Sequence, residues 1–212
     1  LAYNMPIFEL EGFEADDVIA TISRNMRGKD VEVIIVSGDK DMVQLVDEKV
    51  KIFDYRSEEL IDGKKAKEKY GFEPGQIVDF LALAGDSTDN IPGVQGIGKV
   101  TATDLIQRYG SLEQIYQHLA DIKSQKVRQK LEEQKEQAVM SKELALLDDH
   151  VPLDFDIKSV QYVAPNHERL LSFFERLEFR KFAEEMGAAS GTDLACQETI
   201  LRSAKDIKDL CE

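Results

Sequence analysis

The sequence predicts an α/β domain with a mostly parallel sheet and flanking helices, followed by a helical subdomain. Three observations support this prediction. Residues 31–37 form a β-branched run between Gly28 and Gly38, which is typical of a buried parallel strand. Helical patterns precede and follow that run. From Pro74 onward, apolar residues recur only at helical spacing.

The first third of the chain alternates helix and strand. Residues 16–27 should form a helix, because Val18, Ile22 and Met26 share one face. The strand at 31–37 follows, and after it we expect a short helix and a second strand, at 41–46 and 50–53. This alternation indicates an α/β core.

The rest of the chain is predicted to be helical. A loop rich in Gly, Pro and Asp interrupts it at 85–98, Gly110 should end one helix, and Ser111 should cap the next. In the last helix we expect Leu170, Phe173, Phe174, Leu177 and Phe182 to face inward as core. Helices are expected at 74–84, 99–109, 112–119, 125–147 and 167–186.

These elements suggest three parts. Residues 1–73 form the α/β core and residues 74–186 the helical subdomain. Residues 187–212 form a linker and tail, because Gly, Ala, Ser and Thr make up 187–192 and the residues after 192 are too few to fold alone.

Composition excludes several classes of protein. The 212 residues are 42% hydrophobic and contain no apolar run of the ~20 residues that a membrane span needs. The two cysteines, Cys196 and Cys211, cannot form a disulfide framework and are consistent with the cytoplasm. The net charge is −14, but residues 91–147 hold 8 basic and 7 acidic residues. Only this middle segment would not repel phosphate.

Acidic residues stand in three blocks beside apolar elements. Each block alone has a structural explanation: acids at a helix start, a capped turn after a strand, and an Asx turn. Together they would repel one another unless a cation held them. Oxygen ligands without His or Cys nearby favour Mg²⁺ or Mn²⁺, and a pair of such ions supports phosphodiester hydrolysis. The candidate catalytic and metal ligands are Glu14, Asp16, Asp17, Asp39, Asp41, Asp86 and Asp89.

A glycine-rich loop precedes the helix expected at 99–109. It lacks the GxxxxGK[ST] pattern of a nucleotide-binding loop, and it is typical of a helix-hairpin-helix, which binds DNA phosphates through backbone amides. A plain helix–helix turn is the alternative. The candidate DNA-binding residues are Gly93, Val94, Gln95, Gly96, Ile97, Gly98 and Lys99. Lysines and Arg128 in 123–142 extend this contact or form solvated helix faces.

Three ordered blocks, at residues 12–17, 37–41 and 85–98, closely resemble the signatures of bacterial 5′ nucleases. These are the flap endonuclease/5′→3′ exonuclease domains, with a PIN-like core, at the amino end of DNA polymerase I. The resemblance spans residues 10–186. It implies a magnesium- or manganese-dependent hydrolase acting in DNA replication and repair on double-stranded DNA with a 5′ flap or nick.

The resemblance also implies roles for individual residues. Glu14, Asp16 and Asp17 would serve one metal ion. A second ion would be served by Asp39, Asp41 and Asp89, with Asp86 beside it. A K⁺ ion held by carbonyls of the Gly93–Gly98 loop would assist phosphate binding, and polymerase domains would follow in the same polypeptide.

The family begins with an Asp-bearing strand and an arch that threads the flap. Neither is present in this sequence, so we expect the isolated chain to be inactive although its parent is a nuclease. Two other functions stay open: a non-catalytic, structure-specific DNA-binding module, and a small-molecule phosphohydrolase that uses Asp39 and Asp41. The isolated residues His118, His150 and His167 are expected at the surface or in packing.

Overall fold

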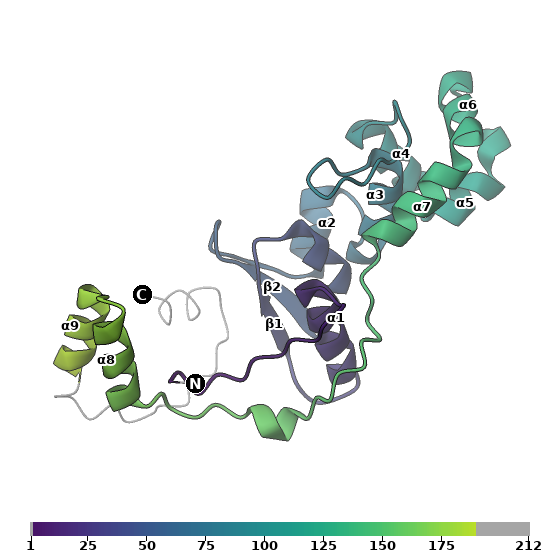
Figure 1. Cartoon of the computed structure of the whole chain (residues 1–212). Helices are drawn as coiled ribbons and strands as arrows, with labels where there is room; N and C mark the ends of the chain where they lie inside the picture. Colours follow the sequence, from purple (N-terminus) through teal and green to yellow (C-terminus); the bar gives the residue numbers. More distant parts are fainter. Residues whose placement is uncertain (1, 190–212) are drawn as a thin grey trace. The chain divides into compact units, whose positions relative to one another are not determined.

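The computed structural model describes residues 2–189 (Figure 1). They divide into two compact units: residues 12–151 form one, and residues 2–11 with 152–189 form the other. Among the described residues, no helix is long and apolar enough to span a membrane. All seven candidate metal ligands lie in the first unit.

The sheet of this unit has three strands in the order β1 (Val33–Val36), β2 (Val50–Asp54) and β3 (Glu59–Ile61). β1 pairs with β2 in parallel, with Val33 opposite Val50. β3, which the sequence did not predict, pairs with β2 in antiparallel fashion, so the sheet is mixed rather than mostly parallel. Only the short turn between Asp54 and Glu59 joins β2 to β3, and a parallel pair would need a long crossover connection, so these two strands must be antiparallel. This turn is closed by Asp54 Oδ1, which accepts from Arg56 N at 2.9 Å.

The helices around the sheet follow the predicted order. α1 (Ala15–Met26) precedes β1, and a 3₁₀ helix, η1 (Lys40–Leu45), connects β1 to β2. Met42 and Ile52, which are fully buried, belong to the core that continues into the helical part of the unit. This placement sets Asp39 and Asp41 immediately beyond the carboxyl end of β1.

The helical part contains α2 (Gly63–Tyr70), η2 (Pro74–Gln76), α3 (Ile77–Ala84), α4 (Lys99–Tyr109), α5 (Leu112–Gln117) and η3 (Leu119–Asp121). The bounds predicted for α4 are confirmed, and Gly110 follows it with φ +88°. Ser111 caps α5 by accepting from Gln114 N at 3.3 Å. α2 was not predicted because it is strongly charged, with only Ala66 buried.

The single helix predicted at 125–147 is wrong. The chain forms α6 (Gln125–Glu133) and α7 (Lys135–Ala145), with a break at Gln134, where φ is −120° and ψ is 27°. The side chain of Gln134 forms two hydrogen bonds with the backbone of Gln95, at 2.7 and 3.3 Å. A tertiary contact across 39 residues therefore accompanies the break, and the apolar pattern does not encode it.

The second unit contains η4 (Ile157–Val160), α8 (His167–Arg176) and α9 (Arg180–Ala189). The single helix predicted at 167–186 is broken where Glu178 takes a left-handed φ of 57°. Only Leu170 and Phe174 are buried, whereas Phe173, Leu177 and Phe182 are 39, 42 and 52% exposed, so these three are not core. The predicted linker begins inside α9, and the rest of the tail lies outside the described residues.

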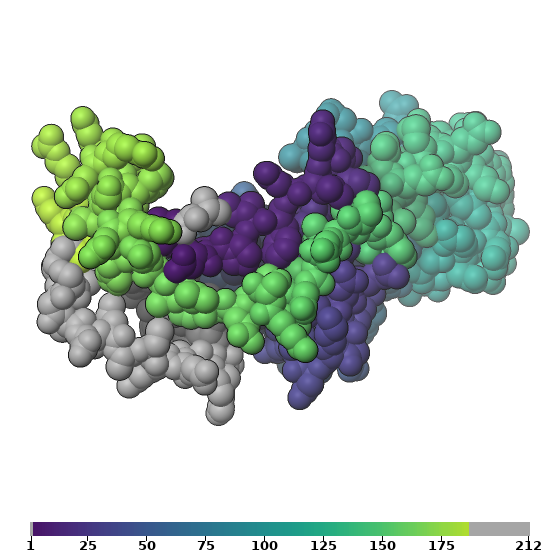
Figure 2. Space-filling view, turned by 60° about the horizontal axis from the view of Figure 1, so that its bottom comes forward, coloured from purple at the N-terminus to yellow at the C-terminus, as the bar shows by residue number. Residues whose placement is uncertain are grey.

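Two distant segments join in this second unit. The amino-terminal residues run alongside the segment after residue 152, in purple and green (Figure 2). Asn166 N donates to Ala2 O at 3.1 Å, and Asn4 Nδ2 donates to Ala164 O at 2.6 Å. Phe8 packs against Phe155 edge to face, with ring centroids 5.4 Å apart.

Candidate metal centre and nucleic-acid interface

The three acidic blocks occupy the ends of three elements. Glu14 is the N-cap of α1, and Asp16 and Asp17 lie in its first turn. Asp39 is the N-cap of η1, which contains Asp41. Asp86 and Asp89 lie in the loop that follows α3, and together these acids complete the set of candidate ligands.

Three carboxylates form what we call the acid cluster: Asp41, Asp86 and Asp89. One oxygen from each lies within 4.8 Å of the others, close enough to share one cation. Asp86 is only 9% exposed. Asp41 Oδ1 is buried and has no hydrogen-bond partner among the described residues. A buried oxygen without a partner is costly, and an all-carboxylate donor set is what Mg²⁺ or Mn²⁺ prefers.

The loop that carries two of these residues is closed by its backbone. Asp86 and Ile91 exchange two hydrogen bonds of 2.8 Å, and Asp86 Oδ1 accepts from Thr88 N at 2.9 Å. Asn90 takes a left-handed φ of 57°, a conformation that Asn tolerates well. These contacts fix Asp86 and leave Asp89 exposed at the tip of the loop.

Electrostatic coupling extends the acid cluster toward α1. Burial raises the pKa of Asp41 to about 6, and the nearby carboxylates Asp39, Asp89 and Asp86 add to the rise. Burial likewise raises the pKa of Asp16, and Asp39 is the strongest of the carboxylates that raise it further; Glu14, Asp17 and Asp89 follow. All seven predicted ligands therefore lie in one negatively charged region.

Some of these acids also have structural roles. Asp17 uses both of its oxygens: Oδ1 accepts from Asp148 N at 2.9 Å and Oδ2 from Glu14 N at 3.3 Å. Asp39 Oδ1 accepts from Asp41 N at 2.9 Å. The cap and turn explanations thus hold locally even though the acids gather in one place. They leave Asp41 Oδ1 buried and without a hydrogen-bond partner among the described residues.

Sequence reasoning missed Lys40. Its Nζ lies 2.5 Å from Asp86 Oδ2 and 3.5 Å from Asp89 Oδ2, between two members of the acid cluster. Burial lowers its pKa, but the hydrogen bond to Asp86 and the charges of Asp41 and Asp89 outweigh burial and raise it. Lys40 stands between two candidate ligands in the sequence, and that position was the available signal.

The second predicted site is the hairpin loop, residues 93–98, which is held by side chains of α6 and α7. We call these four residues the loop clamp: Lys130, Gln134, Gln137 and Ser141. They recur at spacings of four, three and four, so they follow one helical face across the break. Gln134 bonds both backbone groups of Gln95.

The other clamp residues bind the loop at two of its three glycines. Gln137 Nε2 donates to Gly93 O at 2.5 Å, and Gly93 N donates to the buried Ser141 Oγ at 3.1 Å. Lys130 Nζ donates to Gly96 O at 2.9 Å. The loop is therefore held in one shape before any ligand binds.

Most of the loop amides that were predicted to bind phosphate already donate hydrogen bonds within the protein. The amides of Gly93 and Gln95 donate to clamp side chains, that of Val94 to Leu83 O and that of Ile97 to Val94 O. Among the described residues, no acceptor contacts the amides of Gly96 and Gly98. The free donors are thus these two amides and the first turn of α4, beginning at the exposed Lys99.

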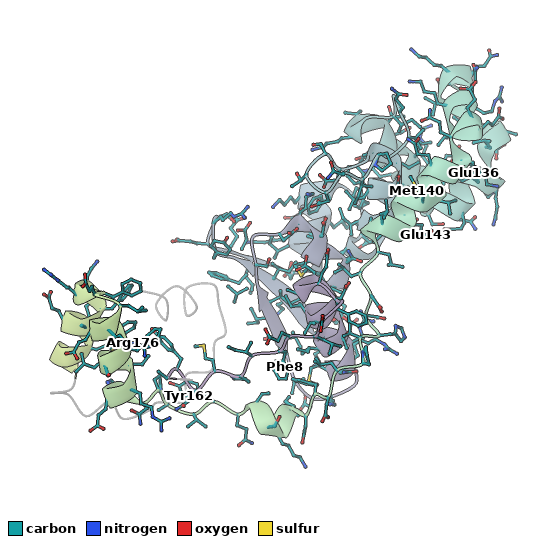
Figure 3. The ribbon with its side chains drawn as sticks, in the orientation of Figure 1. Phe8, Glu136, Met140, Glu143, Tyr162 and Arg176 are labelled. Carbon is teal, nitrogen blue, oxygen red and sulfur yellow. The ribbon has the colours of Figure 1, made fainter. Side chains whose placement is uncertain are left out.

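The basic residues of 123–142 differ in how far they can contribute to phosphate binding. Lys142 pairs with Asp79 at 2.6 Å and Glu113 at 2.7 Å, so its charge is already compensated. Glu136, Met140 and Glu143 lie along an exposed face of α7 (Figure 3). This acidic face would repel phosphate, whereas Lys130 is turned to the hairpin loop.

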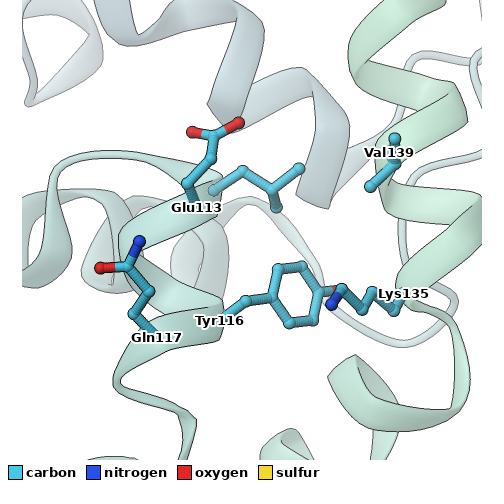
Figure 4. A pocket seen from close by; sticks show the side chains of 6 residues that line it. Glu113, Tyr116, Gln117, Lys135 and Val139 are labelled. Carbon is cyan, nitrogen blue, oxygen red and sulfur yellow. The ribbon is translucent and has the colours of Figure 1, made fainter.

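A separate hollow of about 310 Å³ lies between α5 and α7, and Figure 4 shows its lining. Lys135 Nζ stands 5.4 Å from the ring centroid of Tyr116, and the Tyr116 hydroxyl donates to Leu131 O at 3.1 Å. Its one carboxylate, Glu113, is paired with Lys142. The lining of this hollow offers no free carboxylate for hydrolysis, so the acid cluster is the better candidate for a catalytic site.

Comparison with known proteins identifies the family and the fold. The N-terminal resolvase-like domain of 5′-3′ exonucleases matches residues 1–71, and the C-terminal SAM fold of 5′-3′ exonucleases matches residues 72–168. DNA polymerase I of Caldicellulosiruptor bescii is 38% identical over 99% of this chain and 25% of its own length. The chain thus spans about a quarter of the length of such relatives.

Two solved structures share the fold. A T5 5′-exonuclease described as binding divalent metal ions (zinc) has a TM-score of 0.63 at 28% identity, covering 68% of this chain and 53% of its own. The bacteriophage T5 D15 flap endonuclease, in a complex with DNA and metal ions, has a TM-score of 0.59 at 28% identity, covering 66% and 52%. The predicted fold, an α/β core with a helical subdomain, is confirmed. Since the two matched segments together cover residues 1–168, the chain belongs to the 5′-3′ exonuclease family, as its three acidic blocks indicated.

Proposed function

We propose that this chain is the metal-binding and DNA-binding part of a 5′ nuclease that hydrolyses DNA at a 5′ flap or nick. The observation that carries the proposal is the acid cluster, in which three carboxylate oxygens converge and Asp41 Oδ1 has no partner among the described residues. Membership of the 5′-3′ exonuclease family supports DNA as the substrate over a small phosphate ester.

The residues divide between two cation positions. Asp41, Asp86 and Asp89 would hold one Mg²⁺ or Mn²⁺ ion, and Glu14 with Asp16 would hold the other. Asp17 would position these ligands, because backbone amides already occupy both of its oxygens. Asp39, which accepts a backbone amide only at Oδ1, would serve the ion of the acid cluster through Oδ2. When bound, such a pair of ions activates a water and stabilises the attacking and leaving oxygens of the phosphodiester.

The hairpin loop would hold the duplex by its backbone. Phosphates would bind the amides of Gly96 and Gly98 and the start of α4, with the ammonium of Lys130 beside them. A K⁺ ion does not fit the loop as it stands. The carbonyls of Gly93, Gln95 and Gly96 accept from the clamp, and that of Val94 accepts from Ile97 N. We assign the cationic position at Gly96 to Lys130.

The partners follow from the substrate and from the relatives. Because the chain matches about a quarter of DNA polymerase I, we propose that polymerase domains follow it in the parent polypeptide. We propose a cytoplasmic location, because the DNA substrate would lie there with the chromosome. The positions of polymerase and nuclease in one chain suit the removal of a flap that synthesis displaces.

The test combines metal binding with DNA binding, because the acid cluster and the hairpin loop both lie in the described residues. Calorimetric titration with Mn²⁺ should show weaker binding by Asp89→Asn, at least roughly tenfold, because losing even an outer-shell group costs about that much. The control is Glu48→Gln, an exposed acid outside the site. Equal Mn²⁺ affinity for all three proteins contradicts the metal assignment.

The DNA part of the test uses anisotropy of a labelled 5′-flap duplex. Gly96→Glu should abolish most binding, because it adds bulk and negative charge beside the free amides. In the parent polypeptide, Mn²⁺-dependent flap cleavage should disappear with Asp89→Asn. Flap binding without any cleavage in the parent would favour the non-catalytic DNA-binding module instead.

A further inference from the structure

Val100 is the most exposed large apolar side chain among the described residues. Its exposed fraction is 86%, whereas that of Tyr162, the next in order, is 72%. Val100 lies in the first turn of α4, two residues after the N-cap Gly98. So exposed a side chain buries almost no apolar surface, and a β-branched residue is slightly unfavourable in a helix. The stability of the folded chain therefore does not explain a valine at this position.

The surface around Val100 consists of free backbone donors. Among the described residues, no acceptor contacts the amides of Gly96 and Gly98. The first intrahelical bond of α4 runs from Ala102 N to Gly98 O at 3.0 Å, so the amides of residues 99–101 have no acceptor within the helix. Single exposed apolar residues are common on protein surfaces. Here, however, the side chain stands among the donors that would hold DNA phosphates, so bound DNA would cover it.

The direction of helical side chains places Val100 beside a strand bound at these donors. Each Cα–Cβ bond of a helix tilts toward the amino-terminal end, so the isopropyl group of Val100 leans toward the free amides. A phosphate held by those amides is flanked by two sugars of the same strand. An isopropyl group forms no hydrogen bond, so it suits the C–H surface of a sugar better than a phosphate or the polar edge of a base. The group that Val100 would contact is therefore a sugar next to the bound phosphate.

We propose that Val100 contacts a deoxyribose of the strand held by the hairpin loop and makes this surface select DNA over RNA. This inference rests on the proposed function and adds to it the sugar that the surface accepts. The 2′ carbon of deoxyribose carries only hydrogen, whereas that of ribose carries a hydroxyl, which is both donor and acceptor. Against Val100, this hydroxyl would lose water without gaining a partner. A threonine, which has nearly the same shape as valine, would supply that partner through its own hydroxyl.

The test measures binding of labelled 5′-flap duplexes by anisotropy in EDTA, so that no cleavage occurs. In a series of duplexes, one ribonucleotide replaces one deoxyribonucleotide at successive positions of each strand. For wild type, the ribonucleotide should weaken binding about tenfold at one or two neighbouring positions, the size expected for a hydroxyl that is dehydrated without a partner. In Val100→Thr, the loss at the same positions should be less than about twofold, because the two hydroxyls bond each other.

Val139→Thr makes the same change at an exposed position of α7 and should give the wild-type profile. Both substitutions lie at the surface and keep the shape of the side chain, so the fold of the variants is preserved. A wild-type profile without any sensitive position, or an equal loss in Val100→Thr, overturns the role of Val100, while binding of the all-DNA duplex and of Mn²⁺ leaves the proposed function standing. Failure of wild type to bind the all-DNA duplex overturns both.

Discussion

The acid cluster and the hairpin loop lie in the same compact unit and satisfy their polar groups in opposite ways. In the cluster, like charges face one another, and Asp41 Oδ1 has no partner among the described residues. In the loop, the clamp side chains bond two backbone amides and three backbone carbonyls, and other backbone groups bond the amides of Val94 and Ile97. From this difference we expect that the first region can accept a cation, whereas the second is held by its own hydrogen bonds.

The largest effect should be a difference between two glycines of the loop in the free energy of unfolding that each loses on substitution by Ala. Gly93 has a φ of +61°, and in Gly93→Ala the new Cβ would lie 2.3 Å from the backbone N of Gly85, so the backbone itself must move. We expect a loss of about 3 kcal/mol in the free energy of unfolding. In Gly96→Ala, with φ +84°, the Cβ meets only the flexible end of Lys130, and about 1 kcal/mol should be lost. Urea unfolding measures both, and equal losses would show that the loop is not rigidly seated.

Removing one clamp residue should have the next largest effect. Gln134→Ala deletes both hydrogen bonds to Gln95, which should cost about 2 kcal/mol at roughly 1 kcal/mol each. In the same variant, hydrogen exchange of the Gln95 amide should accelerate, because this amide loses its acceptor. Gln129→Ala, an exposed position on α6, is the control. Unchanged exchange at Gln95 would mean that the clamp does not hold the loop.

Asp41 should respond to pH in the opposite sense from an ordinary paired carboxylate. Because the pKa of Asp41 is raised to about 6, the folded state binds a proton more tightly than the unfolded state does, and metal-free stability should fall as pH rises from about 4 to 6. Asp41→Asn should remove this fall and gain about 1 kcal/mol at pH 7, a value reduced for the partial exposure of the group.

Thermal melting of both proteins in EDTA between pH 4 and 7 measures the difference. Parallel curves for wild type and Asp41→Asn would contradict a raised pKa. With Mn²⁺ present the sign should reverse for wild type, because metal binding needs the ionised carboxylate and strengthens as pH rises through about 6.

The smallest effect concerns the two lysines, one in each region. Lys40→Met should lower metal-free stability by less than about 1 kcal/mol, because this partly exposed ion pair is screened. It should also raise Mn²⁺ affinity several-fold, since the ammonium no longer competes for Asp86 and Asp89. Lys130→Met, the matched change at the loop, should leave Mn²⁺ affinity unaltered. Equal effects of the two changes on Mn²⁺ binding would remove the distinction between the regions.

The sequence alone determined the elements whose signals are local. Gly110 and Ser111 marked the end of α4 and the start of α5, and both were confirmed because a left-handed glycine and a serine cap act within a few residues. The three acidic blocks and the glycine-rich segment were recognisable for the same reason: their residue types and spacing are themselves the signal. That was enough to identify the family.

Tertiary structure decided what depends on contacts between distant residues. The break at Gln134 accompanies bonds to Gln95, and the position of Lys40 between Asp86 and Asp89 depends on a loop far along the chain. The exposure of Phe173 and Phe182 also could not be read from helical spacing, because a periodic pattern gives a face and not the partner that covers it. Local backbone preferences are written in the sequence, whereas the satisfaction of each polar and apolar group depends on which segments the fold brings together.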